Sequence, residues 1–93
     1  MNLKMLNLSV NAEKELAKLA ERAGKENRVL RISVILACCD EKVLFETSSK
    51  QKKDRIVYNR GFNIYANPYA YNYTAGAQVD FESGGYLIKI PAD

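Results

Sequence analysis

Apolar and polar residues repeat with two different periods along the chain. Between residues 10 and 23 the apolar residues recur at intervals of three and four, which places them on one side of an α-helix. Ser9 precedes this segment and can accept a hydrogen bond from a backbone N–H that the first helical turn leaves unpaired. Gly24 follows it and is expected to end the helix. The pattern therefore predicts a helix over residues 10–23.

Most of the remaining chain alternates apolar and polar residues with a period of two, which is typical of strands with one buried face. The strands are expected at residues 29–36, 43–47, 55–58, 62–65, 77–82 and 86–90. Residues 59–61 and 83–85 contain glycine and are expected to reverse the chain in tight turns, and Gly76 is expected to be left-handed. Residues 68–73 fit either a short helix or an extended loop.

Length and composition are those of a small folded protein. The 93 residues are expected to form one domain, residues 1–93, with a modest core. The sequence has no apolar run of about 18 residues and no apolar segment typical of a signal peptide at its start, so a cytoplasmic protein without a membrane partner is expected. The net charge of +3 is too mild to indicate nucleic-acid binding by itself.

The two cysteines, Cys38 and Cys39, are adjacent and lie in a turn expected at residues 37–42. A disulfide between neighbours is strained, so no disulfide framework is indicated. Histidine, the commonest general base and a common metal ligand, is absent from the sequence. Cys39 and Cys38 are therefore the candidate metal ligands, with Asp40 and Glu41 as oxygen donors beside them. In the alternative, Cys38 is a small buried residue and Cys39 has no function.

Two further groups of residues could carry chemistry. Residues 50–55 are rich in Lys and Arg, and with the nearby tyrosines they could bind single-stranded nucleic acid by charge and stacking, although a solvated loop and ordinary packing are favoured. These tyrosines are Tyr65, Tyr69, Tyr71 and Tyr73. Asp80 and Glu82 share one face of a strand, where they could form an acid–base pair or simply face water. The sequence does not contain the full set of residues of any known catalytic motif, so an enzyme is not expected.

The closing segment of the chain resembles that of a known family. Residues 76–81 read Gly-Ala-Gln-Val-Asp-Phe, and a glycine turn and a strand led by Tyr86 and ending at Pro91 follow. This is similar to the HesB/IscA family, the A-type proteins of iron–sulfur cluster assembly, which has a "Leu-Asp-Gly-Thr-x-Val-Asp-Phe" segment before "Gly-Phe-x-Phe-x-Asn-Pro". Residues 30–34, Leu-Arg-Ile-x-Val, and residues 8–9, Leu-Ser, resemble earlier family motifs in the same order.

The resemblance implies a β-rich, mixed α+β fold, a compact β-sandwich or pseudobarrel with one N-terminal helix and a short helical turn at residues 68–73. It also implies a scaffold or carrier in iron–sulfur cluster biosynthesis. The first of three family cysteines falls on Cys39, with Cys38 as an additional thiol, and Glu41 stands where the family has glycine. The family's C-terminal Cys-Gly-Cys has no counterpart in these 93 residues, so the chain resembles a degenerate member.

The thiol count limits the cofactor that one chain could hold. Iron–sulfur clusters are held by about four thiolates, whereas one chain has two and a symmetric homodimer would have four. The resemblance implies iron or an iron–sulfur cluster at Cys39 and Cys38, with assembly or recipient proteins as partners; nucleic acid is disfavoured. Because the chain departs from the family motif, the absence of any cofactor is equally favoured. In that alternative the chain is a metal-free interaction module of the same fold, with residues 65–73 as its interface.

Overall fold

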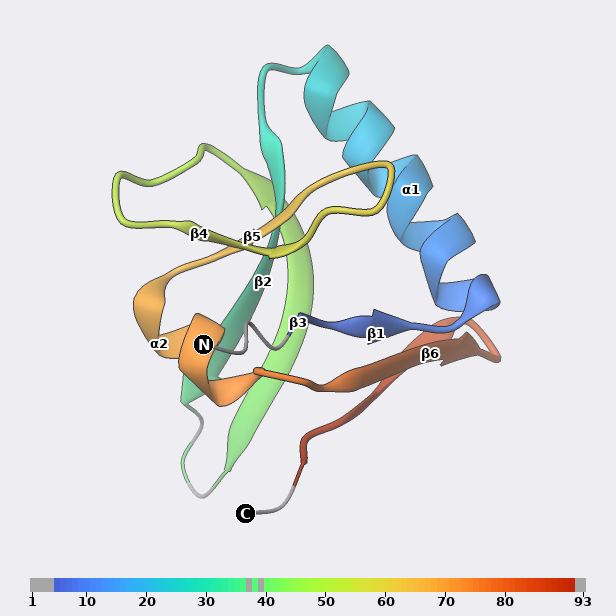
Figure 1. Cartoon of the computed structure of the whole chain (residues 1–93), viewed down its shortest axis with the longest axis vertical. Coiled ribbons are helices and arrows are strands. Elements are labelled where there is room, and N and C mark those ends of the chain that lie inside the picture. Colours follow the sequence, from blue (N-terminus) through green and yellow to red (C-terminus); the bar gives the residue numbers. More distant parts are fainter. Residues whose placement is uncertain (1–4, 37, 39, 92–93) are drawn as a thin grey trace.

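The computed structural model describes residues 5–36, 38 and 40–91. Its strands form two sheets, and one long helix packs along their side (Figure 1). The elements are β1 (Asn7–Leu8), α1 (Val10–Lys25), β2 (Val29–Leu36), β3 (Glu41–Ser48), β4 (Arg55–Tyr58), β5 (Ile64–Ala66), α2 (Pro68–Tyr73), β6 (Gln78–Glu82) and β7 (Gly85–Lys89). The strand-rich α+β fold with an N-terminal helix, predicted from the sequence, is confirmed.

The larger sheet has the strand order β3-β2-β5-β4, and the smaller sheet has the order β1-β6-β7. In the larger sheet β2 pairs antiparallel with β3 and parallel with β5. In the smaller sheet β1 runs parallel to β6, and β6 and β7 form an antiparallel hairpin. The chain around β1 links the two sheets, because Leu6 N–H donates to Val57 O and Asn7 N–H donates to Ala77 O, each at 2.9 Å.

Helix α1 begins as predicted but ends later. Ser9 caps it, since Ser9 Oγ accepts a hydrogen bond of 3.1 Å from the backbone N–H of Ala12. The helix continues to Lys25, and Asn27, with a φ of 58°, is the residue that takes the left-handed conformation. The prediction that Gly24 ends the helix is wrong, because Asn also tolerates positive φ and supplies the reversal further along.

All six predicted strands are present, with changes at their ends. Pairing of β2 with β3 continues to Leu36 and Glu41, so the turn holding the cysteines is shorter than predicted. Strand β5 begins at Ile64, so the predicted three-residue turn after Tyr58 is wrong and residues 59–63 form the connection. The expected positive φ is confirmed at Gly76 (73°), and Gly61 in the connection also has a positive φ (95°).

The two shorter predictions near the C-terminal half also hold. Residues 68–73 are helical, and the Asn67 side chain caps this helix by accepting from the backbone N–H of Ala70 at 2.8 Å. The last hairpin reverses at Ser83 and Gly84, with φ values of 54° and 79°, and pairs Glu82 with Gly85. Positive φ at both positions matches the right-handed twist of the adjoining strands.

The core lies between the two sheets and α1. Its largest fully buried side chains are Leu16, Leu30, Ile32, Ile64, Val79 and Thr74. Along β2 burial decreases toward the C-terminal end of the strand, where the side chain of Leu36 is 72% exposed. The β2–β3 hairpin therefore extends beyond the core. Among the described residues no helix is both long and apolar enough to cross a membrane.

Candidate functional site: the cysteine turn

The turn between β2 and β3 carries the cysteines. Cys38 is exposed there, so the alternative in which it is a buried packing residue is wrong. Cys39 lies outside the described residues. Two apolar side chains at the end of β2 are also exposed next to this turn, Ile35 at 49% and Leu36 at 72%. The hairpin thus presents a thiol and apolar surface to the exterior together.

The carboxylates beside the cysteines already have hydrogen-bond partners within the protein. Asp40 Oδ1 accepts from the backbone N–H of Glu41 at 2.8 Å, and the Glu41 carboxylate accepts a hydrogen bond from the hydroxyl of Tyr69. This bond, followed by partial burial, raises the pKa of Tyr69 above its ordinary value. Tyr69 also stacks on Tyr73, with ring centroids 6.1 Å apart and an interplanar angle of 17°. Helix α2 is therefore joined to the turn end of the hairpin, where Glu41 pairs with Leu36.

These donors fit iron only in part. Across residues 5–36, 38 and 40–91, no three His, Cys, Asp or Glu side chains lie close enough to hold a metal ion. The exposed Cys38 thiol is a suitable soft ligand, and the adjacent Cys39 would add a second. Because a cluster takes about four thiolates, a second chain would have to supply the others.

The basic run and two of the tyrosines are brought together. Lys50 Nζ lies 5.6 Å from the ring centroid of Tyr65, and the Arg55 guanidinium lies 5.4 Å from that of Tyr71. These are cation–π distances. One face of each ring is therefore covered by a cation of the same chain, which leaves less aromatic surface for stacking on a base.

The side chains of Asp80 and Glu82 have different surroundings. Asp80 Oδ1 accepts from Ser9 Oγ at 2.6 Å and from the backbone N–H of Phe81 at 2.7 Å. The Ser9 hydrogen bond, followed by that of Phe81, lowers the pKa of Asp80. Glu82 is exposed at the hairpin end. Asp80 thus supports the cap of α1, and the prediction that it simply faces water is only partly right.

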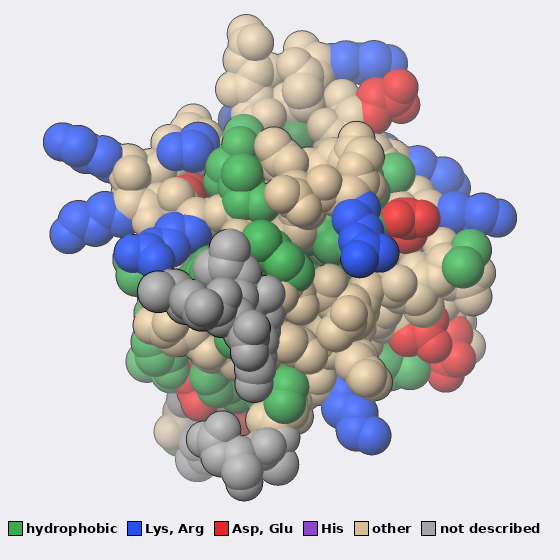
Figure 2. Space-filling model, in the orientation of Figure 1, with side chains coloured by type: hydrophobic (Ala, Val, Ile, Leu, Met, Phe, Trp, Pro, Cys, Tyr) green, Lys and Arg blue, Asp and Glu red, His purple; other side chains and the backbone are tan. Residues whose placement is uncertain are grey.

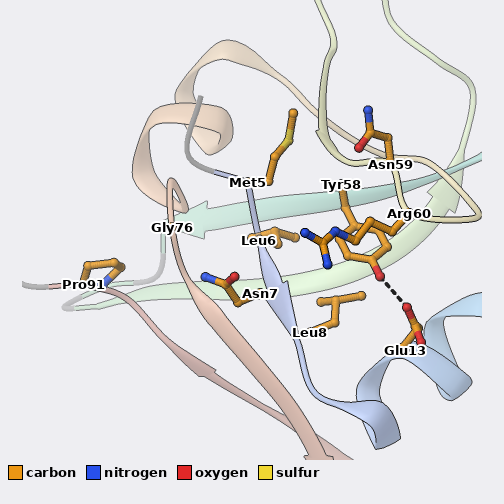
Figure 3. Close-up of a pocket in the computed structure, with 10 residues that line it drawn as sticks. All are labelled: Met5, Leu6, Asn7, Leu8, Glu13, Tyr58, Asn59, Arg60, Gly76 and Pro91. Carbon is orange, nitrogen blue, oxygen red and sulfur yellow. Dashed lines mark hydrogen bonds between the residues drawn. The ribbon is translucent and has the colours of Figure 1, made fainter. Parts of the chain in front are cut away.

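A pocket of about 690 Å³ that no local sequence pattern indicates lies between β1, the first turn of α1 and the end of β4 (Figure 3). Its lining residues are Met5, Leu6, Asn7, Leu8, Glu13, Tyr58, Asn59, Arg60, Gly76 and Pro91. The Tyr58 hydroxyl donates to Glu13 Oε2 at 2.6 Å across it. Burial, followed by this carboxylate, raises the pKa of Tyr58 to about 12. Tyr58 therefore keeps its proton near neutral pH and acts as the hydrogen-bond donor to Glu13.

Comparison with known proteins places the fold. No family model matches the sequence. A protein of Aquifex aeolicus (strain VF5) is 28% identical over 86 residues, covering 86% of this chain and 74% of that protein. A solution NMR structure of a protein from Aquifex aeolicus has a TM-score of 0.58 at 20% identity, covering 98% of this chain and 97% of that one.

Two further solved structures are more similar in shape. Escherichia coli SufA, described as involved in biosynthesis of iron–sulfur clusters, has a TM-score of 0.73 at 20% identity, covering 100% of this chain and 86% of that one. IscA, solved with a [2Fe-2S] cluster, has a TM-score of 0.72 at 23% identity, covering 94% of this chain and 86% of that one. The chain has the HesB/IscA-like fold, and the resemblance seen in its sequence is confirmed at this level.

Proposed function

We propose that this protein acts in iron–sulfur cluster biosynthesis as a scaffold or carrier rather than an enzyme, with Cys39 and Cys38 binding iron or a cluster as cargo. The fold that it shares with SufA and IscA supports this role. The observation that carries the proposal is the exposed Cys38 in the β2–β3 turn, next to the position where the family has its first ligand. An exposed turn lets cargo enter and leave without unfolding of the core.

Two chains would share the cargo. One chain has two thiols, so a symmetric dimer has the four that a cluster ordinarily takes. Ile35 and Leu36 are exposed beside the turn and would be covered by the second chain. Removing such side chains from water is favourable by roughly 25 cal/mol per Å² of apolar surface, from which the entropic cost of association is subtracted. The dimer and the cargo site are thus proposed to form at one surface.

The site is proposed to hold its cargo weakly. A cluster with thiolate ligands is anionic, and Asp40 and Glu41 place two carboxylates next to the cysteines. Like charges at short range repel each other. Glu41 is also held by Tyr69, so it is not free to turn toward iron without breaking that hydrogen bond. Weak retention suits a carrier that passes its cargo on.

The carrier role is tested by transfer. The protein is loaded with iron and sulfide without oxygen, separated from free ions and mixed with an apo-ferredoxin as recipient. The recipient is expected to gain its own absorption and electron-transfer activity faster than with free iron and sulfide. The control is Cys38→Ser/Cys39→Ser, taken through the same loading. Equal rates for the loaded protein, the control and free ions would contradict the role.

A metal-free interaction module of the same fold is the second candidate. It is favoured by Tyr69, which is 51% exposed, stacks on Tyr73 and donates a hydrogen bond to Glu41 of the hairpin. If this candidate is right, the chain self-associates without iron, the double serine variant still does so, and Tyr69→Ala abolishes it. Sedimentation of the unaltered chain and both variants, each with and without iron, distinguishes the two. On the carrier hypothesis iron bound by the thiols strengthens association and the double serine variant loses this gain, whereas the interaction module associates equally with and without iron.

A further inference from the structure

The positive charge of the chain is concentrated in one short segment, residues 50–55, called here the basic segment. It contains four of the 14 basic residues and one of the 11 acidic residues. The rest of the chain therefore has ten of each and no net charge. Figure 2 shows Lys and Arg side chains projecting at the left edge of the molecule, where Figure 1 places the connection between β3 and β4.

The acidic residue of the basic segment does not neutralise its surface. The side chain of Asp54 is fully covered and turns inward, where it accepts hydrogen bonds from Arg31 Nε at 2.9 Å and Arg31 Nη2 at 2.7 Å. The backbone N–H of Gln51 donates to the same carboxylate at 2.8 Å, which fixes the shape of the segment. The exposed side chains of the segment are thus its four cations and the neutral Gln51.

The cations of the basic segment are arranged in two ways. Lys50 lies over Tyr65 of β5 and Arg55 lies over Tyr71 of α2, which holds these two cations against the folded chain. Lys52 and Lys53 occupy the exposed turn, and neither makes a hydrogen bond or ion pair with any described residue. The ends of the basic segment are therefore held in place by the tyrosines, and the exposed turn between them has two lysines without an acidic partner among the described residues.

We propose that the basic segment is a docking surface for an acidic segment of a partner protein. Charge complementarity supports this partner, since four cations within six residues match a short run of carboxylates. Single-stranded nucleic acid fits less well, because it is bound by open aromatic faces along a basic groove. Here the basic segment's own cations cover one face of Tyr65 and of Tyr71, and neither described pocket is lined by the segment.

The docking surface is separate from the cysteine turn. Strand β3 joins them, with the turn before Glu41 and the basic segment after Ser48, and its eight residues span roughly 25 Å. A partner bound at the basic segment would leave the thiols accessible. The proposal therefore does not rest on the cargo role, and binding can be measured on the metal-free protein.

The test uses a fluorescent peptide of alternating glutamate and glycine as the probe, titrated with the full chain at low ionic strength. Lys52→Glu/Lys53→Glu is expected to raise the Kd about tenfold or more, since two attractions become repulsions. The matched control is Lys14→Glu/Lys89→Glu, which makes the same change in net charge at exposed sites elsewhere and should leave the Kd within about twofold. Binding of the peptide to the unaltered chain should also weaken when the salt concentration is raised to about 0.15 M.

Three results would overturn the proposal. The first is absence of peptide binding by the unaltered chain. The second is an equal loss in the control variant, which would mean that only net charge matters. The third is tighter binding of single-stranded oligothymidylate of equal charge, with the same loss in Lys52→Glu/Lys53→Glu, which would assign the surface to nucleic acid. A circular dichroism spectrum unchanged in both variants shows that the comparison concerns folded protein.

Discussion

Arg31 and Asp54 form a covered ion pair in which the guanidinium donates two roughly parallel hydrogen bonds, of 2.9 and 2.7 Å, to the two carboxylate oxygens. The side chain of Arg31 is 11% exposed and that of Asp54 is fully covered. Arg31 Nη1 also lies 3.7 Å from Glu46 Oε2, and Ser33 Oγ donates to the same oxygen at 2.9 Å. The pair joins β2 to the connection that follows β3.

Removing the charge of Asp54 should be costly, because it leaves a buried guanidinium without its main partner. Asp54→Asn is expected to lower the free energy of unfolding by about 3 kcal/mol, measured by urea denaturation. The matched control is Glu15→Gln, which breaks the exposed pair with Lys18 at 3.2 Å and should cost no more than about 0.5 kcal/mol. Equal losses of unfolding free energy in the two variants would show that the covered Arg31–Asp54 pair stabilises the protein no more than an exposed pair does.

The same pair predicts how stability depends on acid. Burial raises the pKa of Asp54, but the Arg31 hydrogen bonds and charge and the Gln51 N–H outweigh it and hold the pKa below its ordinary 3.8. A carboxyl with a lower pKa in the folded state contributes stability that is complete above 3.8 and is lost as the pH falls through the folded value. The stability difference between wild type and Asp54→Asn should therefore shrink below about pH 4. A difference independent of pH would contradict this.

The stability contributed by Tyr58 should depend on pH in the opposite direction, with a loss at alkaline pH. Its pKa is raised from 10 to about 12, so the stability that its neutral hydroxyl contributes is present below pH 10 and lost between about 10 and 12. A tyrosinate titration followed by near-ultraviolet absorbance should lose its most alkaline step in Tyr58→Phe. This variant should also lose about 1 kcal/mol of stability at neutral pH, since Glu13 is exposed and regains water. An unchanged titration would show that another tyrosine has the highest pKa.

Ser9 and Asp80 are 71 positions apart and tie the start of α1 to β6. Ser9→Ala removes both the cap and the hydrogen bond to Asp80, and we expect it to cost about 1 kcal/mol or slightly more in urea unfolding. Ser49→Ala is the control, because the exposed Ser49 caps no helix and should cost nearly nothing. In an Asp80→Ala background the cost of Ser9→Ala should be smaller. Additive costs would show that the two residues act independently.

The sequence was informative wherever local pattern determines structure. The alternation of residues 29–36 predicted β2, and Ser9 predicted the start of α1, because strand faces and helix caps depend on neighbouring residues. The end of α1 was placed too early because Gly24 stays helical while Asn27 makes the reversal. The family motifs extended the prediction to the fold, which could not follow from periodicity alone.

Features that depend on distant residues could not be predicted. Tyr58 and Glu13 meet across 45 positions, and Arg31 and Asp54 across 23, so neither the pocket nor the covered ion pair has a signal in local spacing. The sequence left Cys38 open between a metal ligand and a small buried residue, so its exposure could be seen only in the structure. The bond between Glu41 and Tyr69 likewise required the packing of α2 against the hairpin. The prediction that Cys39 is a ligand lies outside the described residues and stays a prediction.

Whether Cys39 and Cys38 bind iron is measured by the visible absorption and iron content of the protein after loading with iron and sulfide in the absence of oxygen. We expect a thiolate-to-iron charge-transfer band with bound iron in the wild type, and loss of both in Cys39→Ser. Cys38→Ser should weaken the band without abolishing it, because Cys39, at the position of the family's first ligand, is still present. A colourless wild-type protein without iron, or a Cys39→Ser variant that binds iron equally well, would contradict the account.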